Sequence, residues 1–143
     1  MSAAPAIQIR DAIVQHLRGM SYAFSLPVAA EQIRGTLDLS GELKGLYGVT
    51  VAAEDGGDWA GNTNRTLVSI RPRITVFTHL EDDVDGVQCD VLTTDLLNFM
   101  QQISYTLEGW QVAWNGNWQI SSTGVYDSFR QNILTATIPI VKQ

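Results

Sequence analysis

The 143-residue sequence contains one cysteine, Cys89, so it cannot form an intramolecular disulfide. That absence is typical of a reducing compartment, and we expect Cys89 to be a buried, small apolar side chain rather than a reactive thiol. No stretch approaches about 18 consecutive apolar residues, so we expect no membrane span. The N-terminus has no basic segment followed by an apolar one, which predicts no signal peptide.

Positive charge is also scarce. The 9 Lys and Arg residues are outnumbered by 15 Asp and Glu residues, which gives a formal net charge of −6. A protein that binds DNA over a broad surface needs clustered basic residues, and this sequence lacks such clusters. The balance is compatible with a protein past which DNA moves without specific binding. The length predicts one domain over residues 1–143, large enough to bury a core.

Motifs for catalysis and for metal binding are missing. The sequence has no GxSxG and no Walker loop. His16 and His79 are far apart and have no CxxC or HExxH nearby, which argues against zinc. The acidic run at residues 81–86 resembles the first half of an EF-hand calcium loop. Leu92 occupies the twelfth position of that loop, where a bidentate glutamate is needed, so we expect a solvated turn. We therefore expect no enzyme, no catalytic residue, no cofactor and no metal.

Two helices are predicted from apolar periodicity. The first covers about residues 6–20, with an apolar face made of Ile9, Ala12, Ile13, His16, Leu17 and Met20. Because no second ligand lies at helical spacing from His16, we expect a packed, hydrogen-bonded histidine. The second covers about residues 90–108, with Gly109 at the position of a left-handed C-terminal cap. Its apolar face consists of Leu92, Leu96, Phe99, Met100, Ile103 and Leu107.

Strands are predicted where apolar and polar residues alternate. The three clearest segments are residues 46–54, 65–80 and 130–143. Pro72 marks an edge or a bulge in the second of these, and Pro139 marks an edge position in the third. Residues 21–46 contain apolar runs broken by Pro and Gly, which predicts one or two short strands. The order predicts an α+β fold in which two amphipathic helices pack on a mostly antiparallel β-sheet.

The segment QVAWNGNWQI, residues 111–120, predicts a tryptophan-bearing β-hairpin. A two-residue Asn-Gly turn would set apolar side chains opposite polar ones. A three-residue loop at residues 115–117 instead sets Trp114 opposite Trp118, and burial chooses between such registers. We therefore expect a bulged hairpin with one aromatic face. That face either packs in the core or meets another subunit, where tryptophan is enriched.

Two loops are candidate contact sites. Residues 55–64 are rich in Gly, Asp and Asn, and they form a connection longer than most hairpin loops. The tip of the predicted hairpin is the second. Loops on a rigid scaffold commonly carry contacts, although a surface loop without a role is the competing interpretation. The expected interface residues are Asp55, Asp58, Trp59, Asn62, Asn115, Gly116 and Asn117.

The order of these segments resembles the tail terminator and tail-completion proteins of long-tailed bacteriophages. In that family an amphipathic helix precedes the strands, and an arginine opens a long strand that ends in an acidic turn. A long helix, a tryptophan-bearing strand and a closing strand follow. The matching pieces cover most of the chain: IQIRDAIVQHLRG, NRTLVSIRPRITVFTHLEDD, DVLTTDLLNFMQQISYTLEG, GWQVAW and DSFRQNILTATIPIVKQ.

The resemblance implies a structural virion protein that forms a ring, most often of six copies, at the head-proximal end of the tail tube. Such a ring ends tube polymerisation and joins the tail to a neck or connector protein, with DNA passing through its lumen. A heterologous contact that closes on itself makes a ring of this kind. An acidic wall suits DNA passage because it repels phosphates. The protein would be assembled in the cytoplasm of a bacterial host and would lie in the tail or neck of the virion.

The sequence leaves two alternatives open. A head-to-tail stopper or another neck protein has a similar size and forms the same kind of ring. A small soluble ligand-binding or adaptor domain belongs to a different class, and it would run as a monomer or dimer.

Overall fold

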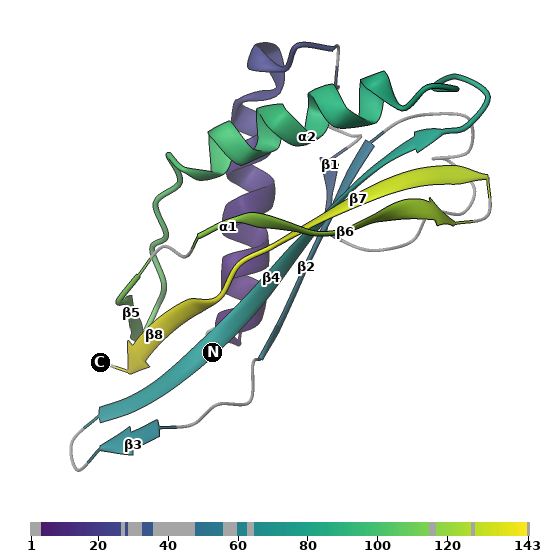
Figure 1. Ribbon diagram of the computed structural model, residues 1–143. Coiled ribbons are helices and arrows are strands. Elements are labelled where there is room, and N and C mark those ends of the chain that lie inside the picture. The colour runs from purple at the N-terminus through teal and green to yellow at the C-terminus, as the bar shows by residue number, and fades with distance from the viewer. Residues whose placement is uncertain are drawn as a thin grey trace.

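The computed structural model describes residues 4–26, 28, 33–35, 48–55, 60–62, 65–114, 117–126 and 128–142. It shows two α-helices packed on a mostly antiparallel sheet, which confirms the predicted α+β fold (Figure 1). The elements are α1 (Pro5–Gly19), the 3-10 helix η1 (Ser21–Ala23), β1 (Ile33–Arg34), β2 (Gly48–Asp55), β3 (Ala60–Asn62), β4 (Arg65–His79), α2 (Val87–Met100), β5 (Trp110–Val112), β6 (Gln119–Tyr126), β7 (Phe129–Thr135) and β8 (Ile138–Lys142).

The sheet is built around β4, which is 15 residues long. On one side β4 pairs antiparallel with β2 and, nearer its start, with β3. On the other side its residues 73–79 pair with β7 and its residues 67–70 pair with β8. β6 then adds to β7, and β5 adds to β8. Among the described strands, only β1 and β2 pair in parallel.

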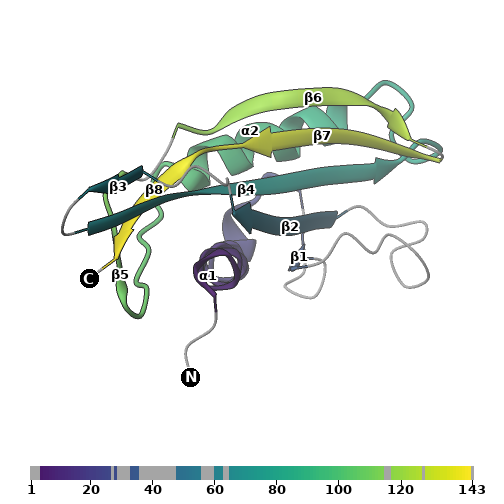
Figure 2. The same cartoon turned by 90° about the horizontal axis from the view of Figure 1, so that it is seen from below.

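The core lies between the two helices and one face of the sheet. Figure 2 shows α1 end-on below the strands and α2 behind β6 and β7. Alternate residues of β4 point into this core, as expected for strands with one buried face. The fully or almost fully buried strand residues include Val49, Val51, Val68, Ile70, Ile74, Val76, Leu134, Ile138 and Ile140. The opposite side of the sheet is called the second face below, and it carries Arg71, Arg73, Thr75 and Phe77 of β4.

The first helix forms as its periodicity predicts. Ile9, Ile13 and Leu17 are fully buried, and Pro5 occupies the first turn, where its missing N–H costs nothing. The Nε2 atom of His16 lies 2.9 Å from the backbone oxygen of Phe99, which is in the last turn of α2. This confirms the packed, hydrogen-bonded histidine, and the bond joins the two helices.

The second helix is shorter than predicted: α2 ends at Met100, not at residue 108. Ile103 and Leu107 are buried as expected, but they belong to an extended segment that closes a turn onto Trp110. Gly109 has a φ of 79° within that turn and does not cap the helix. The segment from Ile103 onward is rich in β-branched and aromatic residues, which lose side-chain freedom in a helix, so burial there does not require helical backbone.

The predicted loop at residues 55–64 is partly strand. β3 occupies residues 60–62 and forms a close hairpin with the start of β4, where Asn62 pairs with Arg65. β2 extends to Asp55, which pairs with Ile70. In residues 21–46, β1 confirms one short strand, and most of the remaining segment lies outside the described residues.

The predicted pairing within residues 111–120 is wrong. β5 pairs with β8, with Val112 opposite Ile140, and β6 pairs with β7 along seven residue pairs. A local hairpin offers β6 far fewer pairs than β7 does, so the longer ladder outweighs the turn propensity of the Asn-Gly sequence. The single aromatic face does not form: Trp118 packs partly against the core, whereas Trp114 is 57% exposed.

The C-terminal segment is two strands and not one, because the ladder is interrupted at residues 136–137. Pro72 lies opposite this interruption, and its backbone oxygen accepts a hydrogen bond of 3.4 Å from the N–H of Ala136. The nitrogen and oxygen of one strand residue point the same way, so the missing N–H of Pro72 faces the point where β4 changes partner from β8 to β7. The predicted irregularity at Pro72 is confirmed. The predicted edge position of Pro139 is wrong, because β8 pairs with β4 on one side and with the short strand β5 on the other. The backbone oxygen of Pro139 accepts a hydrogen bond of 3.0 Å from the N–H of Ala113, just beyond the end of β5.

The acidic turn after β4 contains one carboxylate that is not solvated. Asp83 is 2% exposed and accepts hydrogen bonds from the hydroxyl of Thr78 (2.8 Å) and from the backbone N–H groups of Gln88 and Cys89 (3.0 Å each). The helix N-cap position is Gly86, which has no side chain, so Asp83 satisfies two of the free N–H groups of the first turn. Burial raises the pKa of Asp83, but these hydrogen bonds and the nearby Arg130 charge together lower it below 3.8.

Cys89 is fully buried at the start of α2, which confirms the expected small apolar packing residue. Burial raises the pKa of its thiol to about 11, with the neighbouring carboxylates Asp83 and Asp90 acting in the same direction. The thiol is therefore protonated at neutral pH and inaccessible to solvent.

We predict that Asp83→Asn lowers the free energy of unfolding at pH 7 by about 1–3 kcal/mol, because a buried charge-assisted cap is weakened. The folded-state pKa is lower than the unfolded value of 3.8, so the carboxylate stabilises the fold at higher pH. That contribution is lost as the pH falls through the folded-state pKa. Urea unfolding at a series of pH values measures both effects. Asp82→Asn is the matched control because that side chain is exposed, and an equal loss in the control would contradict the prediction.

The tryptophans provide a second prediction. Trp118→Ala should lower the free energy of unfolding by about 2–4 kcal/mol, because it removes a large side chain packed against the core. Trp114→Ala should change it by less than about 1 kcal/mol because that side chain is mostly exposed. Chemical denaturation followed by far-ultraviolet circular dichroism measures both variants, and the reverse order would show that the packing is different.

Candidate functional site

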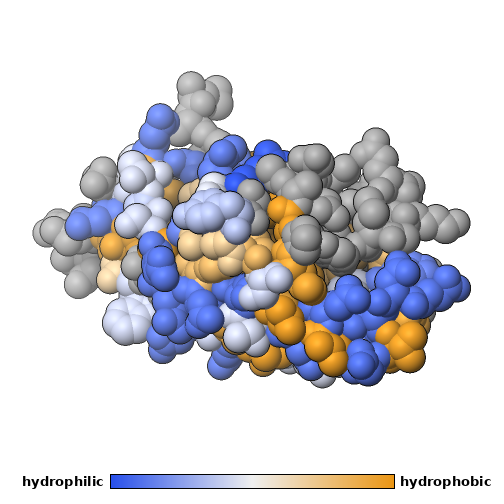
Figure 3. Space-filling model, turned by 90° about the horizontal axis from the view of Figure 1, so that it is seen from above, coloured by the Kyte–Doolittle hydropathy of each residue, from blue (hydrophilic) through white to orange (hydrophobic). Residues whose placement is uncertain are grey.

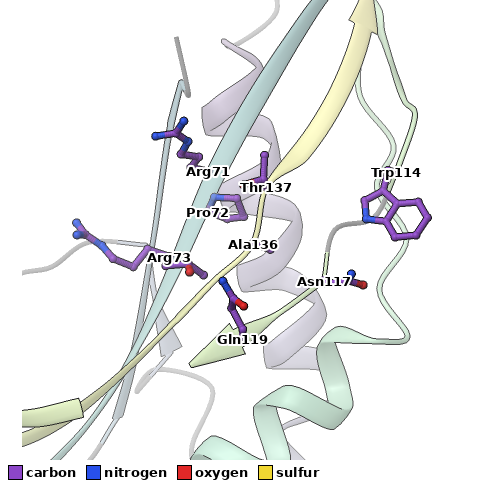
Figure 4. A pocket seen from close by; sticks show the side chains of 9 residues that line it. Arg71, Pro72, Arg73, Trp114, Asn117, Gln119, Ala136 and Thr137 are labelled. Carbon is purple, nitrogen blue, oxygen red and sulfur yellow. The ribbon is translucent and has the colours of Figure 1, made fainter. Parts of the chain in front are cut away.

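A pocket of about 470 Å³ lies on the second face of the sheet, near the middle of β4. Arg73 pairs with Thr135, which in turn pairs with Gln119, so these three side chains share one face across three strands. Their neighbours Ile74 and Leu134 point the other way, into the core. The pocket is completed by Trp114 and Asn117 from the connection between β5 and β6 (Figure 4).

The pocket exists because of the interruption between β7 and β8. Ala136 and Thr137 leave the ladder there, opposite Pro72, and all three residues line the pocket. Proline in the middle of β4 is compatible with this sheet only where no neighbouring strand needs its N–H. The same local irregularity therefore explains both the position of Pro72 and the hollow in the sheet.

The lining of the pocket is cationic and polar. Arg71 and Arg73 contribute positive charge, Asn117 and Gln119 contribute amides, and no lining residue is acidic. Figure 4 shows both arginine side chains extending across the sheet, away from Trp114, so the two arginines and the indole lie on opposite sides of the pocket. The Nε atom of Arg73 is buried and has no hydrogen-bond partner within the described part of the chain. Glu54 of β2 occupies the register position opposite Arg71, so an acidic residue of the same chain lies next to this pair of arginines in the sheet.

A second candidate surface is the outer edge of β6. Among the described strands β6 pairs only with β7, and Figure 2 shows it at the border of the sheet. Its sequence, QISSTGVY, contains no charged residue and no proline, which are the features that usually protect an edge from pairing with another chain. A bulge at Ser121 interrupts the ladder, and residues 122–126 form a regular run after it.

Exposed aliphatic side chains adjoin this edge. Val125 pairs with Arg130, whose guanidinium donates a hydrogen bond of 3.1 Å to the backbone oxygen of Val84. Val84 and Val125 are 78% and 57% exposed, and Val87 in the first turn of α2 is 55% exposed. Figure 3 shows apolar side chains interleaved with hydrophilic ones on the face seen from above. Apolar groups beside an open edge are typical of a protein–protein contact.

The structure places only part of the predicted interface set. Asp55 ends β2 and Asn62 ends β3, both on one side of β4. Asn117 lies on the other side and lines the pocket, so the two predicted groups belong to different surfaces. Asp58, Trp59, Asn115 and Gly116 are outside the described residues.

Sequence reasoning missed Arg71 and Arg73. The signal was present in the triplet Arg71-Pro72-Arg73: strand alternation places both arginines on one face, and the proline between them marks the interruption that opens the pocket. Within the described ranges, no cluster of three or more His, Cys, Asp and Glu side chains is arranged to hold a metal, and no helix is long and apolar enough to cross a membrane.

The comparisons with known proteins give a likeness of fold. No protein-family model matches the sequence, and no curated protein matches it. Among solved structures, the chain is similar to a chain of the structure described as "Virion of native gene transfer agent (GTA) particle", with a TM-score of 0.67 and 15% sequence identity. The match covers 99% of this chain and 100% of that chain. At this identity the two chains share a fold over their whole length.

Proposed function

We propose that this protein is a structural component of a phage-like virion, in which it forms a ring at the head-proximal end of the tail tube. The observation that carries the proposal is the match to a chain of a gene transfer agent virion, which covers 99% of this chain and 100% of that chain. The order of the sequence segments, which resembles that of tail terminator proteins, narrows the role to ending tube polymerisation and joining the tail to a neck or connector protein.

The open edge of β6 supports self-assembly. An unprotected strand offers a row of backbone N–H and C=O groups, and pairing with another chain satisfies them. The aliphatic side chains Val84, Val87 and Val125 would be removed from water by the same contact. A contact between this edge and a different surface of the next copy is heterologous, and six such contacts close a ring.

The charge of the chain supports passage of DNA without binding. A net charge of −6 opposes the binding of phosphates to the chain as a whole, so DNA would move through the lumen with little adhesion. The role proposed is structural and not enzymatic, with its work done by surfaces and not by a catalytic group. Assembly would take place in the cytoplasm of the bacterial host, and the mature protein would lie in the tail or neck of the virion.

The deciding experiment is native mass spectrometry over a concentration series, with the protein alone and with a candidate tail tube protein. We expect a closed ring, of six copies, or tubes of fixed length that carry one ring at one end. A ring that forms but does not limit tube length would instead indicate a stopper or another neck protein. A strict monomer that leaves tube growth unchanged would overturn the proposal and favour a ligand-binding or adaptor domain.

Val125→Lys tests the edge within the same assay. A lysine on the open strand should oppose pairing, so the concentration needed for assembly should rise at least about tenfold, equivalent to about 1.4 kcal/mol. Thermal stability should be unchanged because Val125 is exposed. Val125→Thr keeps a β-branched side chain without the charge, and it should assemble like the unmodified protein. Equal assembly of the lysine variant would show that this edge is not a contact.

A further inference from the structure

We propose that a groove on α2 receives the side chain of Lys142 from a neighbouring copy of this chain. The ammonium group would lie beside the carboxylates of Asp90 and Asp95, and its aliphatic stem would cover Val87 and Val91. This inference rests on the proposed ring and names one of the contacts that would hold it together.

The α2 groove combines aliphatic and acidic side chains. It has a volume of about 420 Å³ and is lined by Ser25, Val87, Asp90, Val91, Thr94 and Asp95. Val87, Val91 and Asp95 follow one another at intervals of four residues, so they lie in one row along the helix, about 5–6 Å apart. A lysine has a four-carbon stem that ends in a charged ammonium group, and this row offers the matching order of apolar and charged surface.

The two carboxylates of the groove are held in place but not neutralised. Both oxygens of Asp95 accept hydrogen bonds from Ser25, one from its backbone N–H (2.8 Å) and one from its hydroxyl (2.9 Å). The Oδ1 atom of Asp90 accepts a bond of 3.2 Å from the amide of Asn132, and its Oδ2 atom accepts none from the described residues. Neither carboxylate forms an ion pair within the described part of the chain. Each carboxylate oxygen has two lone pairs, so both groups can still accept from an incoming ammonium group.

Lys142 is suited to be the incoming group. It is exposed at the last position of β8, and its ammonium group makes no hydrogen bond or ion pair with a described residue. Other basic side chains already have partners in their own chain: Arg10 bonds to Asp11, Arg18 to the backbone oxygen of Ile33, and Arg130 to that of Val84. Lys142 therefore loses no such contact when it binds a carboxylate.

Lys142 cannot reach the groove of its own copy. At the end of β8, the residue before Lys142 pairs with Leu67, whereas Asn132, which bonds to Asp90, pairs with Val76. The stretch of β4 from Leu67 to Val76 spans about 30 Å at ~3.3 Å per residue. Figure 1 shows α2 at the top and the C-terminal end of β8 at the lower left. The contact must therefore join two copies, and giving a lysine to one neighbour while receiving one from the other is the head-to-tail arrangement that closes a ring.

A basic segment of another virion protein is the competing occupant of the groove. Val87 belongs both to the groove and to the aliphatic side chains beside the edge of β6, so a copy that covers this edge also reaches the groove. Each copy carries a net charge of −6, so copies repel one another unless unlike charges meet at their interface. A lysine beside two carboxylates supplies such a contact once per subunit. These observations favour Lys142, and binding of another protein becomes an outcome that the experiment detects.

Carbodiimide crosslinking tests the contact in the unmodified protein. The reagent joins a lysine amine to a carboxylate as an amide when the two groups touch, and the reagent itself takes up the water that is lost. The sequence has two lysines, Lys44 and Lys142, so a crosslinked peptide identifies its lysine without ambiguity. With a mixture of isotopically light and heavy protein, mass spectrometry should find Lys142 joined to Asp90 or Asp95 in peptides that combine the two isotopes.

Variants of Lys142 measure what the contact contributes. Lys142→Gln should raise the concentration needed for ring formation at least about tenfold, because two carboxylates are then left without a cation. Lys142→Arg keeps the charge but lacks the amine that the reagent needs, so it should assemble like the unmodified protein and lose the crosslink. Thermal stability should be unchanged in both variants because Lys142 is exposed.

Substitutions in the groove should weaken assembly in the same way. Asp90→Asn with Asp95→Asn removes both charges while the amide oxygens can still accept from Asn132 and Ser25, so ring formation should again need at least about tenfold more protein. If circular dichroism shows that this variant is unfolded, Thr94→Lys places a positive charge in the groove at an exposed position and should weaken assembly in its place.

The controls separate this contact from general charge effects. Arg10→Gln removes one positive charge elsewhere on the surface, as Lys142→Gln does at the contact. Glu81→Gln with Asp82→Asn removes two negative charges that are exposed outside the groove, which matches the change in net charge of the groove variant. Neither control should change the concentration needed for assembly.

The possible failures are distinguishable. If the unmodified protein neither forms rings nor caps tubes, the proposed function fails. If it forms rings in which Lys142 is not crosslinked to Asp90 or Asp95, or if Lys142→Gln assembles equally well, only this inference is overturned. If the groove variants form rings normally but lose their binding to a candidate tail tube protein, the groove receives a segment of that protein and the inference is also overturned.

Discussion

The pairing of β4 with strands on both of its sides is the interaction on which the rest of the structure depends. This one strand contacts β2 and β3 on one side and β7 and β8 on the other. Its alternate residues supply much of the core that α1 and α2 cover, and the remaining residues form the second face with its pocket. A shift of one residue in β4 would exchange these two sets, so the buried face and the arginine-lined face are fixed together.

Pro72 connects the sequence of β4 to the shape of its partners. Because Pro72 has no N–H, a continuous strand beside it would lack one hydrogen bond of the ladder. The structure has no continuous strand there, since β7 ends at Thr135 and β8 begins at Ile138. The gap leaves a hollow that Arg71, Arg73 and Trp114 line. Pro72 thus explains why the C-terminal strand is divided and why a candidate binding pocket lies beside the division.

The sequence predicts those features that depend on residues close together in the chain. The amphipathic face of α1, the alternation of β4 and the irregularity at Pro72 are all local, and each is confirmed. The pairing of residues 111–120 depends on which distant strand offers the longest ladder, and a favourable Asn-Gly turn gives no information about that competition. For the same reason, the arginines of the pocket are visible in the sequence, whereas their proximity to Trp114 and Asn117 comes only from the tertiary structure.

The carboxylates of the acidic turn after β4 lie in two different environments. Asp83 points inward and satisfies the first turn of α2, while Glu81 and Asp82 remain at the surface on a backbone that His79 and Gln88 hold in place. The buried carboxylate therefore fixes the position from which the exposed carboxylates project.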